Sequence, residues 1–252
     1  MKKKIKSFWN SRAKNKLLAG SNTTLPDLLE TNYLIKLIKK NKSILDVGCG
    51  NGIFLARLIK KTNFKSALGL DYSKQMINEA KKRRIKKSQF MVMDMTDKKS
   101  LQLLNKKFDY IVTKRSLINL ANFKQQVRVL DQLSKLLKKN GRILSCENSL
   151  TNLKNINEVR KKVGLKKITP PWHNVYIENT RLINYKFKHI RFVNLHEFSS
   201  SFYFVTRVLN ALISKLKKNT KFDENIIQIG YSLDQNLIPG YSQNVVFEFL
   251  KK

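Results

Sequence analysis

Cysteine is scarce in this chain, with only Cys49 and Cys146 among its 252 residues. Two thiols are too few for a disulfide framework or a cysteine-ligated zinc site. The cluster of three cysteines that holds an iron–sulfur centre in radical enzymes is also missing. We therefore predict no metal site, and we expect both cysteines to be small, buried side chains.

Long apolar runs and linker-like segments are absent as well. No stretch approaches the roughly 20 apolar residues that cross a bilayer. The basic start at 1–5 is followed by Ser7 and Asn10 rather than by the apolar centre of a signal peptide. No segment rich in proline, glycine or serine divides the chain. We therefore expect a cytoplasmic protein with a single domain over residues 1–252, whose 42% hydrophobic residues supply one sizeable core.

Acidic residues are few, since 17 Asp and Glu stand against 51 Lys and Arg and give a net charge of +34. Such an excess attracts polyanions nonspecifically, RNA among them, and the attraction weakens with salt. Two interpretations stay open, a solvated surface or a functional polyanion-binding surface. The basic clusters are spread along the chain, at Lys2–Lys4, Lys81–Lys87, Lys138–Lys139, Arg160–Lys167 and Lys215–Lys221.

The most informative stretch that is present runs from Ser43 to Gly52, where an apolar strand leads into a glycine-rich turn. Its spacing, Asp-x-Gly-x-Gly-x-Gly with Asp46 as the acid, differs from the Gly-x-Gly-x-x-Gly of dinucleotide-binding turns. Glycine lets the backbone approach a ligand where a Cβ would collide with it. The turn therefore predicts a site for a nucleotide-like cofactor, built on Gly48, Gly50 and Gly52.

Further apolar runs alternate with helical patterns. Runs at 66–70 and 90–93 end in Asp71 and Asp94, and two more lie at 110–112 and 142–146. Helical spacing of apolar residues occurs at 76–80 and over Val127–Leu137. This alternation predicts an α/β fold with a doubly wound parallel sheet.

The carboxyl ends of parallel strands meet at one rim, where ligands bind. We expect Gly48, Asp71, Asp94 and residues 113–116 at that rim, with Asp71 placed to accept hydrogen bonds from ribose hydroxyls. Each aspartate alone has another explanation as a helix N-cap. Three acids that follow successive strands favour the cofactor site.

The turn at Asp46–Gly52 resembles motif I of class I S-adenosylmethionine-dependent methyltransferases, and the likeness is strongest over residues 43–147. Segments 8–13 and 20–22 look like the leader that folds over the cofactor in many small methyltransferases. Lys114–Leu120 and Pro170–Asn174 are similar to a small bacterial subgroup of the methyltransferase type 11/25 kind, associated with surface-polysaccharide gene clusters.

The resemblance implies a Rossmann-like seven-stranded sheet, with five parallel strands and a C-terminal antiparallel hairpin, in a three-layer αβα arrangement. It divides the domain into an N-terminal helical lid (1–42), a cofactor-binding core (43–147), additions on the acceptor side around a sixth strand (148–242) and a final strand (243–252). Within the additions we expect helices at 156–163, 180–185 and 202–216, and the sixth strand at 191–195. Aromatic residues at 198 and 202–204 fit either an acceptor pocket or the core.

The resemblance also implies the cofactor, S-adenosylmethionine, with S-adenosylhomocysteine as product. Asp46 would fix the turn and approach the amino group of the methionine part through water, and Asp71 would hold the ribose. Asp94 would lie beside the adenine edge. The full set expected to contact the cofactor is Asp46, Gly48, Cys49, Gly50, Gly52, Asp71, Tyr72, Met76, Asp94 and Met95.

The acceptor is narrowed by motifs that are missing after the fourth strand, where Thr113–Ser116 replaces the Asn/Asp-Pro-Pro-aromatic motif of nucleic-acid amine methyltransferases. A cysteine nucleophile beside a proline, needed for cytosine C5 methylation, is absent. The paired glutamates of protein-arginine enzymes are absent too. We expect SN2 methyl transfer to an oxygen or nitrogen of a small or sugar-like acceptor. RNA methylation and a non-catalytic adenosylmethionine-binding protein are the alternatives.

Four residues are candidates for the catalytic side of the site. His173 is the first candidate base, because imidazole titrates near neutrality and Pro170–Pro171 would fix its loop; a structural histidine is the other interpretation. Glu147 is a second candidate base or a cap for the next segment. Arg115 and Asn119 are expected to orient the acceptor.

Overall fold

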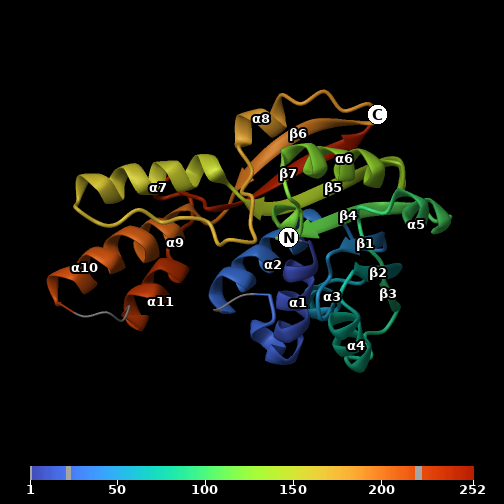
Figure 1. The fold of residues 1–252 in the computed structure, drawn as a ribbon, viewed down its shortest axis with the longest axis horizontal. Coiled ribbons are helices and arrows are strands. Elements are labelled where there is room, and N and C mark those ends of the chain that lie inside the picture. The colour runs from blue at the N-terminus through green and yellow to red at the C-terminus, as the bar shows by residue number, and fades with distance from the viewer. Residues whose placement is uncertain (1, 21–23, 219–222) are drawn as a thin grey trace.

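The computed structural model describes residues 2–20, 24–218 and 223–252, and a seven-stranded sheet runs through its centre (Figure 1). The sheet order is β3-β2-β1-β4-β5-β7-β6. β1 to β5 are parallel, and β7 lies antiparallel between β5 and β6. The strands are β1 Ser43–Val47, β2 Ser66–Asp71, β3 Ser88–Val92, β4 Phe108–Lys114, β5 Leu137–Asn148, β6 Ile190–Glu197 and β7 Asn244–Lys251.

Helices cover both faces of the sheet, and alternate strand residues pack against opposite layers. Ile44 packs in one cluster with side chains of α2, α3 and α4, whereas its neighbour Leu45 packs in another with side chains of α5, α6 and α8. The αβα layering predicted from the sequence is thereby confirmed. The helices of the two layers are α2 Thr24–Leu37, α3 Ile53–Lys61 and α4 Lys74–Lys82 on one face, and α5 Lys98–Leu103, α6 Phe123–Ser134 and α8 Asn179–Ile183 on the other.

A helical lobe extends from the end of the sheet where β5 and β7 meet (Figure 1). Its small core contains Ile156, Phe202, Tyr203 and Val208. The aromatic residues at 202–204 therefore lie in or against a helical core. The lobe consists of α7 Leu150–Lys162, α9 Ser200–Phe204, the π-helical segment η3 Val205–Leu209, α10 Asn210–Leu216 and α11 Glu224–Ser232.

At the N-terminus, α1 Lys2–Arg12 and the 3-10 segment η1 Ala13–Leu18 precede α2. Of the expected leader segment 20–22, Ser21 and Asn22 lie outside the described residues. None of the described helices is long and apolar enough to cross a membrane.

Two expectations about the elements are corrected, and one helix was not expected. α6 ends at Ser134, and Leu137 begins β5 instead of closing the helix, because Leu136 and Leu137 join the same core cluster from a turn and a strand. α7 starts six residues before the expected residue 156, where Ser149 Oγ accepts from Asn152 N at 3.0 Å as its N-cap. The sequence pattern did not predict α11.

β7 pairs with both β5 and β6 in the far half of the sheet, and its Phe247 is fully buried. We expect Phe247→Ala to lower the free energy of unfolding by about 3–5 kcal/mol, because it removes a large core side chain and leaves a cavity. Leu237→Ala, at a position 64% exposed, is the matched control and changes stability little. Urea unfolding of both variants measures the difference, and equal midpoints would contradict the assignment of this core.

Candidate active site

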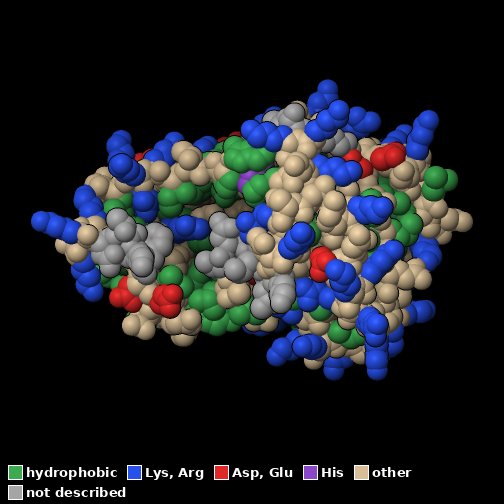
Figure 2. Space-filling model, turned by 60° about the horizontal axis from the view of Figure 1, so that its bottom comes forward, with side chains coloured by type: hydrophobic (Ala, Val, Ile, Leu, Met, Phe, Trp, Pro, Cys, Tyr) green, Lys and Arg blue, Asp and Glu red, His purple; other side chains and the backbone are tan. Residues whose placement is uncertain are grey.

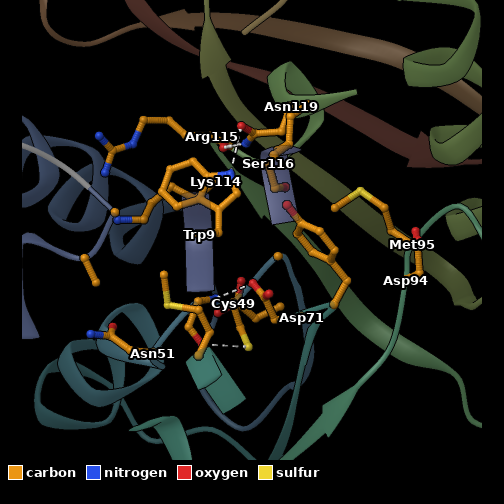
Figure 3. A pocket seen from close by; sticks show the side chains of 18 of the residues that line it. Trp9, Cys49, Asn51, Asp71, Asp94, Met95, Lys114, Arg115, Ser116 and Asn119 are labelled. Carbon is orange, nitrogen blue, oxygen red and sulfur yellow. Dashed lines mark hydrogen bonds between the residues drawn. The ribbon is translucent and has the colours of Figure 1, made fainter. Parts of the chain in front are cut away.

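A cavity opens where the carboxyl ends of β1, β2 and β4 meet the N-terminal helices (Figure 3). In Figure 3, Cys49 and Asp71 lie on one side of the space, Asp94 and Met95 at another, and Trp9, Lys114, Arg115 and Asn119 opposite the glycine turn. The residues that line it are Ile5, Trp9, Ala19, Gly20, Asp27, Asp46, Gly48, Cys49, Gly50, Asn51, Ile53, Phe54, Asp71, Tyr72, Met76, Met93, Asp94, Met95, Thr96, Lys114, Arg115, Ser116, Asn119, Leu120, Ala121 and Gln125.

The glycine turn is held against the next strand by hydrogen bonds from its backbone. Gly48 N and Cys49 N both donate to the Leu70 carbonyl oxygen, at 2.7 and 2.9 Å. Gly48 has φ +76°, and a Cβ there would lie 2.4 Å from the Cβ of Ser116. Gly48 therefore allows the turn to pack directly on the segment after β4.

Gly50 and Gly52 have different functions in the turn. A Cβ at Gly50 would have no atom nearer than 3.9 Å, so this glycine borders open space in the cavity. A Cβ at Gly52 would lie 3.1 Å from Ala80 and Phe90, and Gly52 does not line the cavity. Gly52, at φ +75°, therefore packs against a helix and a strand and lies outside the cavity lining, and its expected contact with a cofactor stays a prediction.

Asp46 is 1% exposed, and its Oδ2 has no hydrogen-bond partner among the described residues. Burial raises the pKa of this carboxyl to about 7. The positive charge of Lys114 opposes this rise, and the negative charge of Asp71 adds to it. A buried carboxylate oxygen that borders a cavity and lacks a partner offers an acceptor for a donor or cation that enters the cavity.

Asp71 and Asp94 are not helix N-caps. Asp71 accepts from Gly50 N at 3.0 Å and from Ser73 N at 2.8 Å, while Ser73 itself caps α4. Asp94 accepts from the backbone and hydroxyl of Thr96, and Asp97 caps α5. Burial raises the pKa of Asp71 to about 6, against the two backbone donors. The structure thus places both acids at one rim, as the strand order predicts.

A buried ion network at the other side of the cavity was not predicted. Asp27 and Glu30 of α2 form ion pairs with two cations of the β4 end. These cations are Lys114, the last residue of β4, and Arg115, which follows it. Arg57 of α3 also pairs with Asp27. Burial raises the pKa of Asp27, but the charges of Lys114 and Arg115 outweigh it and hold the pKa at about 2. The sequence offered one signal for this network: two acids lie three residues apart on one predicted helical segment, in a chain that has few acids.

Arg115 and Asn119, both candidates from the sequence, line this part of the cavity. The Arg115 guanidinium is 3.1 Å from Glu30 Oε2. Asn119 Oδ1 accepts from Trp9 Nε1 at 3.2 Å and from Asn174 Nδ2 at 3.1 Å. Asn119 therefore ties the N-terminal helix and the 170–174 loop to the end of β4.

Glu147 does not line the cavity, and its side chain is fully buried. Its carboxylate accepts from the backbone N–H groups of Ser116, Leu117 and Ile118 at 3.1–3.3 Å. Burial raises its pKa to about 7, against these donors. We therefore assign Glu147 to positioning η2, Leu117–Asn119, in place of the expected role as a base.

His173 also lies outside the cavity lining, one layer behind Trp9. Its ring centroid is 4.5 Å from that of Phe8 and 5.6 Å from that of Trp9. Burial and the charge of Arg12 lower its pKa, so the imidazole is neutral near pH 7. The structure therefore places the imidazole against Phe8 and Trp9 and not in the cavity lining.

A family model described as a methyltransferase domain matches residues 38–176, which spans more than half of the chain. The chain belongs to this methyltransferase family. Protein 235L of Invertebrate iridescent virus 6, which is named as a methyltransferase, is 31% identical over 108 residues. That match covers 42% of this methyltransferase and 37% of the viral protein.

Solved structures support the fold of this methyltransferase. Magnesium protoporphyrin IX methyltransferase ChlM of Synechocystis, with S-adenosylhomocysteine bound, matches with a TM-score of 0.63 at 13% identity over 100% of both chains. The N-methyltransferase NodS of Bradyrhizobium japonicum matches with a TM-score of 0.55 at 14% identity, over 94% of this chain and 90% of its own.

A third structure, a methyltransferase in complex with the Haloferax volcanii activator Trm112, matches with a TM-score of 0.62 at 11% identity over 96% of both chains. The family and the seven-stranded fold predicted from the sequence are confirmed. The narrower bacterial subgroup stays a prediction.

The raised pKa values predict how stability of the ligand-free protein depends on pH. Asp46 in the folded state titrates near 7, well above its ordinary value of 3.8. The folded state therefore binds this proton more tightly than the unfolded chain, so the free energy of unfolding falls as pH rises from about 4 to about 7.

We expect Asp46→Asn to make this decline shallower, because an amide does not titrate. Urea unfolding at about pH 5 and about pH 8 measures the slope. Asp71 and Glu147 contribute with the same sign and keep part of the slope in the variant. Asp234→Asn, at an exposed position, is the control. A slope in Asp46→Asn as steep as in the control would contradict the prediction.

Proposed function

We propose that the cavity binds S-adenosylmethionine and that the protein transfers its methyl group to an oxygen or nitrogen of a small or sugar-like acceptor. The observation that carries the proposal is the convergence of the glycine turn with Asp46, Asp71 and Asp94 on one cavity at the strand ends. When bound, the sulfonium supplies the methyl group in an SN2 displacement, and S-adenosylhomocysteine remains.

The donor side fits the charges and shape of that cofactor. The unpartnered Oδ2 of Asp46 suits an ammonium group, and Gly48, Cys49 and Gly50 offer backbone at close approach. Asp71 keeps lone pairs for ribose hydroxyls beside the two backbone donors it already accepts from. Tyr72, Met76 and Met95 line the walls, with Asp94 at the rim for the adenine amine.

The chain's own contribution to the reaction is binding, orientation and exclusion of water, since a sulfonium is already activated. We propose that residues 1–42 act as the lid, because Ile5, Trp9 and Asp27 from this segment line the cavity. Arg115 and Asn119 would face the acceptor. His173, neutral near pH 7, is the proposed proton acceptor if the acceptor atom must lose a proton.

The names of two similar structures favour a small-molecule acceptor. ChlM is a magnesium protoporphyrin IX methyltransferase, and NodS is an N-methyltransferase. The RNA alternative rests on the basic surface. Figure 2 presents Lys and Arg side chains over much of the visible face, without a single stripe that leads to the hollow. This spread favours the solvated interpretation of the charge.

The donor assignment is tested by titrating S-adenosylhomocysteine into Asp71→Asn. We expect binding to weaken about 10- to 100-fold, because a charged acceptor for two hydroxyls becomes a neutral one. Calorimetry measures the affinity, and fluorescence of Trp9, which lines the cavity, reports it independently. Asp234→Asn is the control and binds as the native protein does. Undiminished affinity for S-adenosylhomocysteine in Asp71→Asn would contradict the assignment of the donor site to this cavity.

Activity itself is tested by transfer of tritiated methyl groups to fractionated cell extract. The proposal expects label in the small-molecule fraction. Label at one nucleotide of RNA would establish the RNA alternative, and affinity for RNA alone would not, because a charge of +34 binds RNA nonspecifically. Cofactor binding without label in any fraction would establish a non-catalytic binding protein.

A further inference from the structure

A second polar cluster lies beside the donor cavity, between the end of the sheet and the helical lobe. Arg207 of η3 has its guanidinium carbon 5.9 Å from the ring centroid of Tyr203 on α9. Tyr176 precedes α8, and its hydroxyl accepts from Gln243 Nε2 at 3.4 Å. Figure 2 shows a hollow between the lobe and the rest of the molecule, with Lys and Arg side chains at its border.

Arg115 connects this cluster to the donor cavity. It lines the cavity, and its positive charge favours the ionised form of both tyrosines. Burial raises the pKa of the Tyr176 hydroxyl, and the positive charges of Arg207 and Arg115 both oppose that rise. Burial and the charge of Glu30 raise the pKa of Tyr203, and the same two guanidinium groups oppose that rise. Two arginines from distant segments therefore converge on one pair of phenols.

The positive charge of Arg207 is not balanced by an acid. Among the described residues no carboxylate forms an ion pair with Arg207, and its buried Nε has no hydrogen-bond partner. The residues outside the described ranges contain no Asp or Glu. A further cation is close instead, because Arg160 Nη1 donates to the Arg207 carbonyl oxygen, and burial together with the charge of Arg207 lowers the pKa of Arg160.

The cluster contains further polar groups that have no partner within the described structure. Gln243 is 5% exposed, and its Oε1 makes no hydrogen bond. The neighbouring cations Arg160 and Arg207 repel each other, and the unpaired buried Nε–H donor of Arg207 costs free energy. An anion that enters this space would relieve both costs. Guanidinium groups suit this purpose, because their fork of N–H donors matches a carboxylate or phosphate.

We propose that Arg207, with Arg115, Tyr176, Tyr203 and Gln243, forms the subsite for an anionic group of the methyl acceptor, a carboxylate or a phosphate. The methyl acceptor is therefore an acid or a phosphorylated compound, and its anionic end lies toward the helical lobe while its nucleophile faces the donor cavity past Arg115. This assignment rests on the proposed function, because it presumes that the neighbouring cavity holds the methyl donor.

The test uses the full chain saturated with S-adenosylhomocysteine, with benzoate and inorganic phosphate as probes and neutral benzamide as the reference. Calorimetry is run at physiological salt, so that weak attraction to surface lysines is screened. We expect Arg207→Gln to bind the preferred anion about tenfold more weakly than the native protein. Arg207→Lys, which keeps the charge and loses the fork, gives an intermediate value.

Arg191→Gln is the matched control, because Arg191 is exposed on β6. Equal anion affinity in Arg207→Gln and Arg191→Gln would overturn the subsite, and so would native protein that binds neither anion better than benzamide. A preference for benzoate identifies a carboxylate acceptor, and a preference for phosphate identifies a phosphorylated one.

Affinity for S-adenosylhomocysteine separates this proposal from the proposed function. Arg207→Gln is expected to keep it, which also establishes that the variant is folded. Native protein that fails to bind S-adenosylhomocysteine would overturn the proposed function instead, whatever the anions do.

Discussion

The register of β1 between β2 and β4 is the constraint on which the site depends. Val47 pairs with Leu70 on one side and with Thr113 on the other, so three strands end at the same level. The Leu70 carbonyl oxygen then accepts from both Gly48 N and Cys49 N and fixes the turn. Every group at the cavity floor takes its position from this alignment, because a shift in register would move each strand end away from its neighbours.

The scarcity of acids acquires a structural meaning in this arrangement. Asp27, Glu30, Asp46, Asp71 and Glu147 are all buried around the cavity, out of 17 acids in the whole chain. Their surroundings are of three kinds. Asp27 and Glu30 pair with cations, Asp71 and Glu147 accept from backbone N–H groups, and Asp46 Oδ2 has no hydrogen-bond partner among the described residues. Because so many acids lie inside, the surface keeps an even larger excess of Lys and Arg than the composition suggests.

The N-terminal segment and the turn after β4 border the cavity on two sides. Asn119 holds Trp9 and Asn174 together, and Asn10 Oδ1 accepts from the Ser73 hydroxyl at 2.6 Å. Glu147 supports the same turn from behind through three backbone N–H groups. This side of the cavity is therefore assembled from segments that are far apart in the sequence.

By itself the sequence determined the parallel sheet and the rim of strand ends at which the cavity lies, and its resemblance to methyltransferases added the seven strands and the three layers. Strand and turn signals are local, and parallel strands must place their carboxyl ends together, so Asp46, Gly48, Gly50, Asp71 and Asp94 followed from spacing. Only the tertiary structure decided the rest: that Gly52 serves packing, that Glu147 faces the backbone, and that Asp27 meets Lys114 and Arg115. These depend on which side chains from distant segments meet, and on how deeply they are buried, which the order of residues along the chain does not contain.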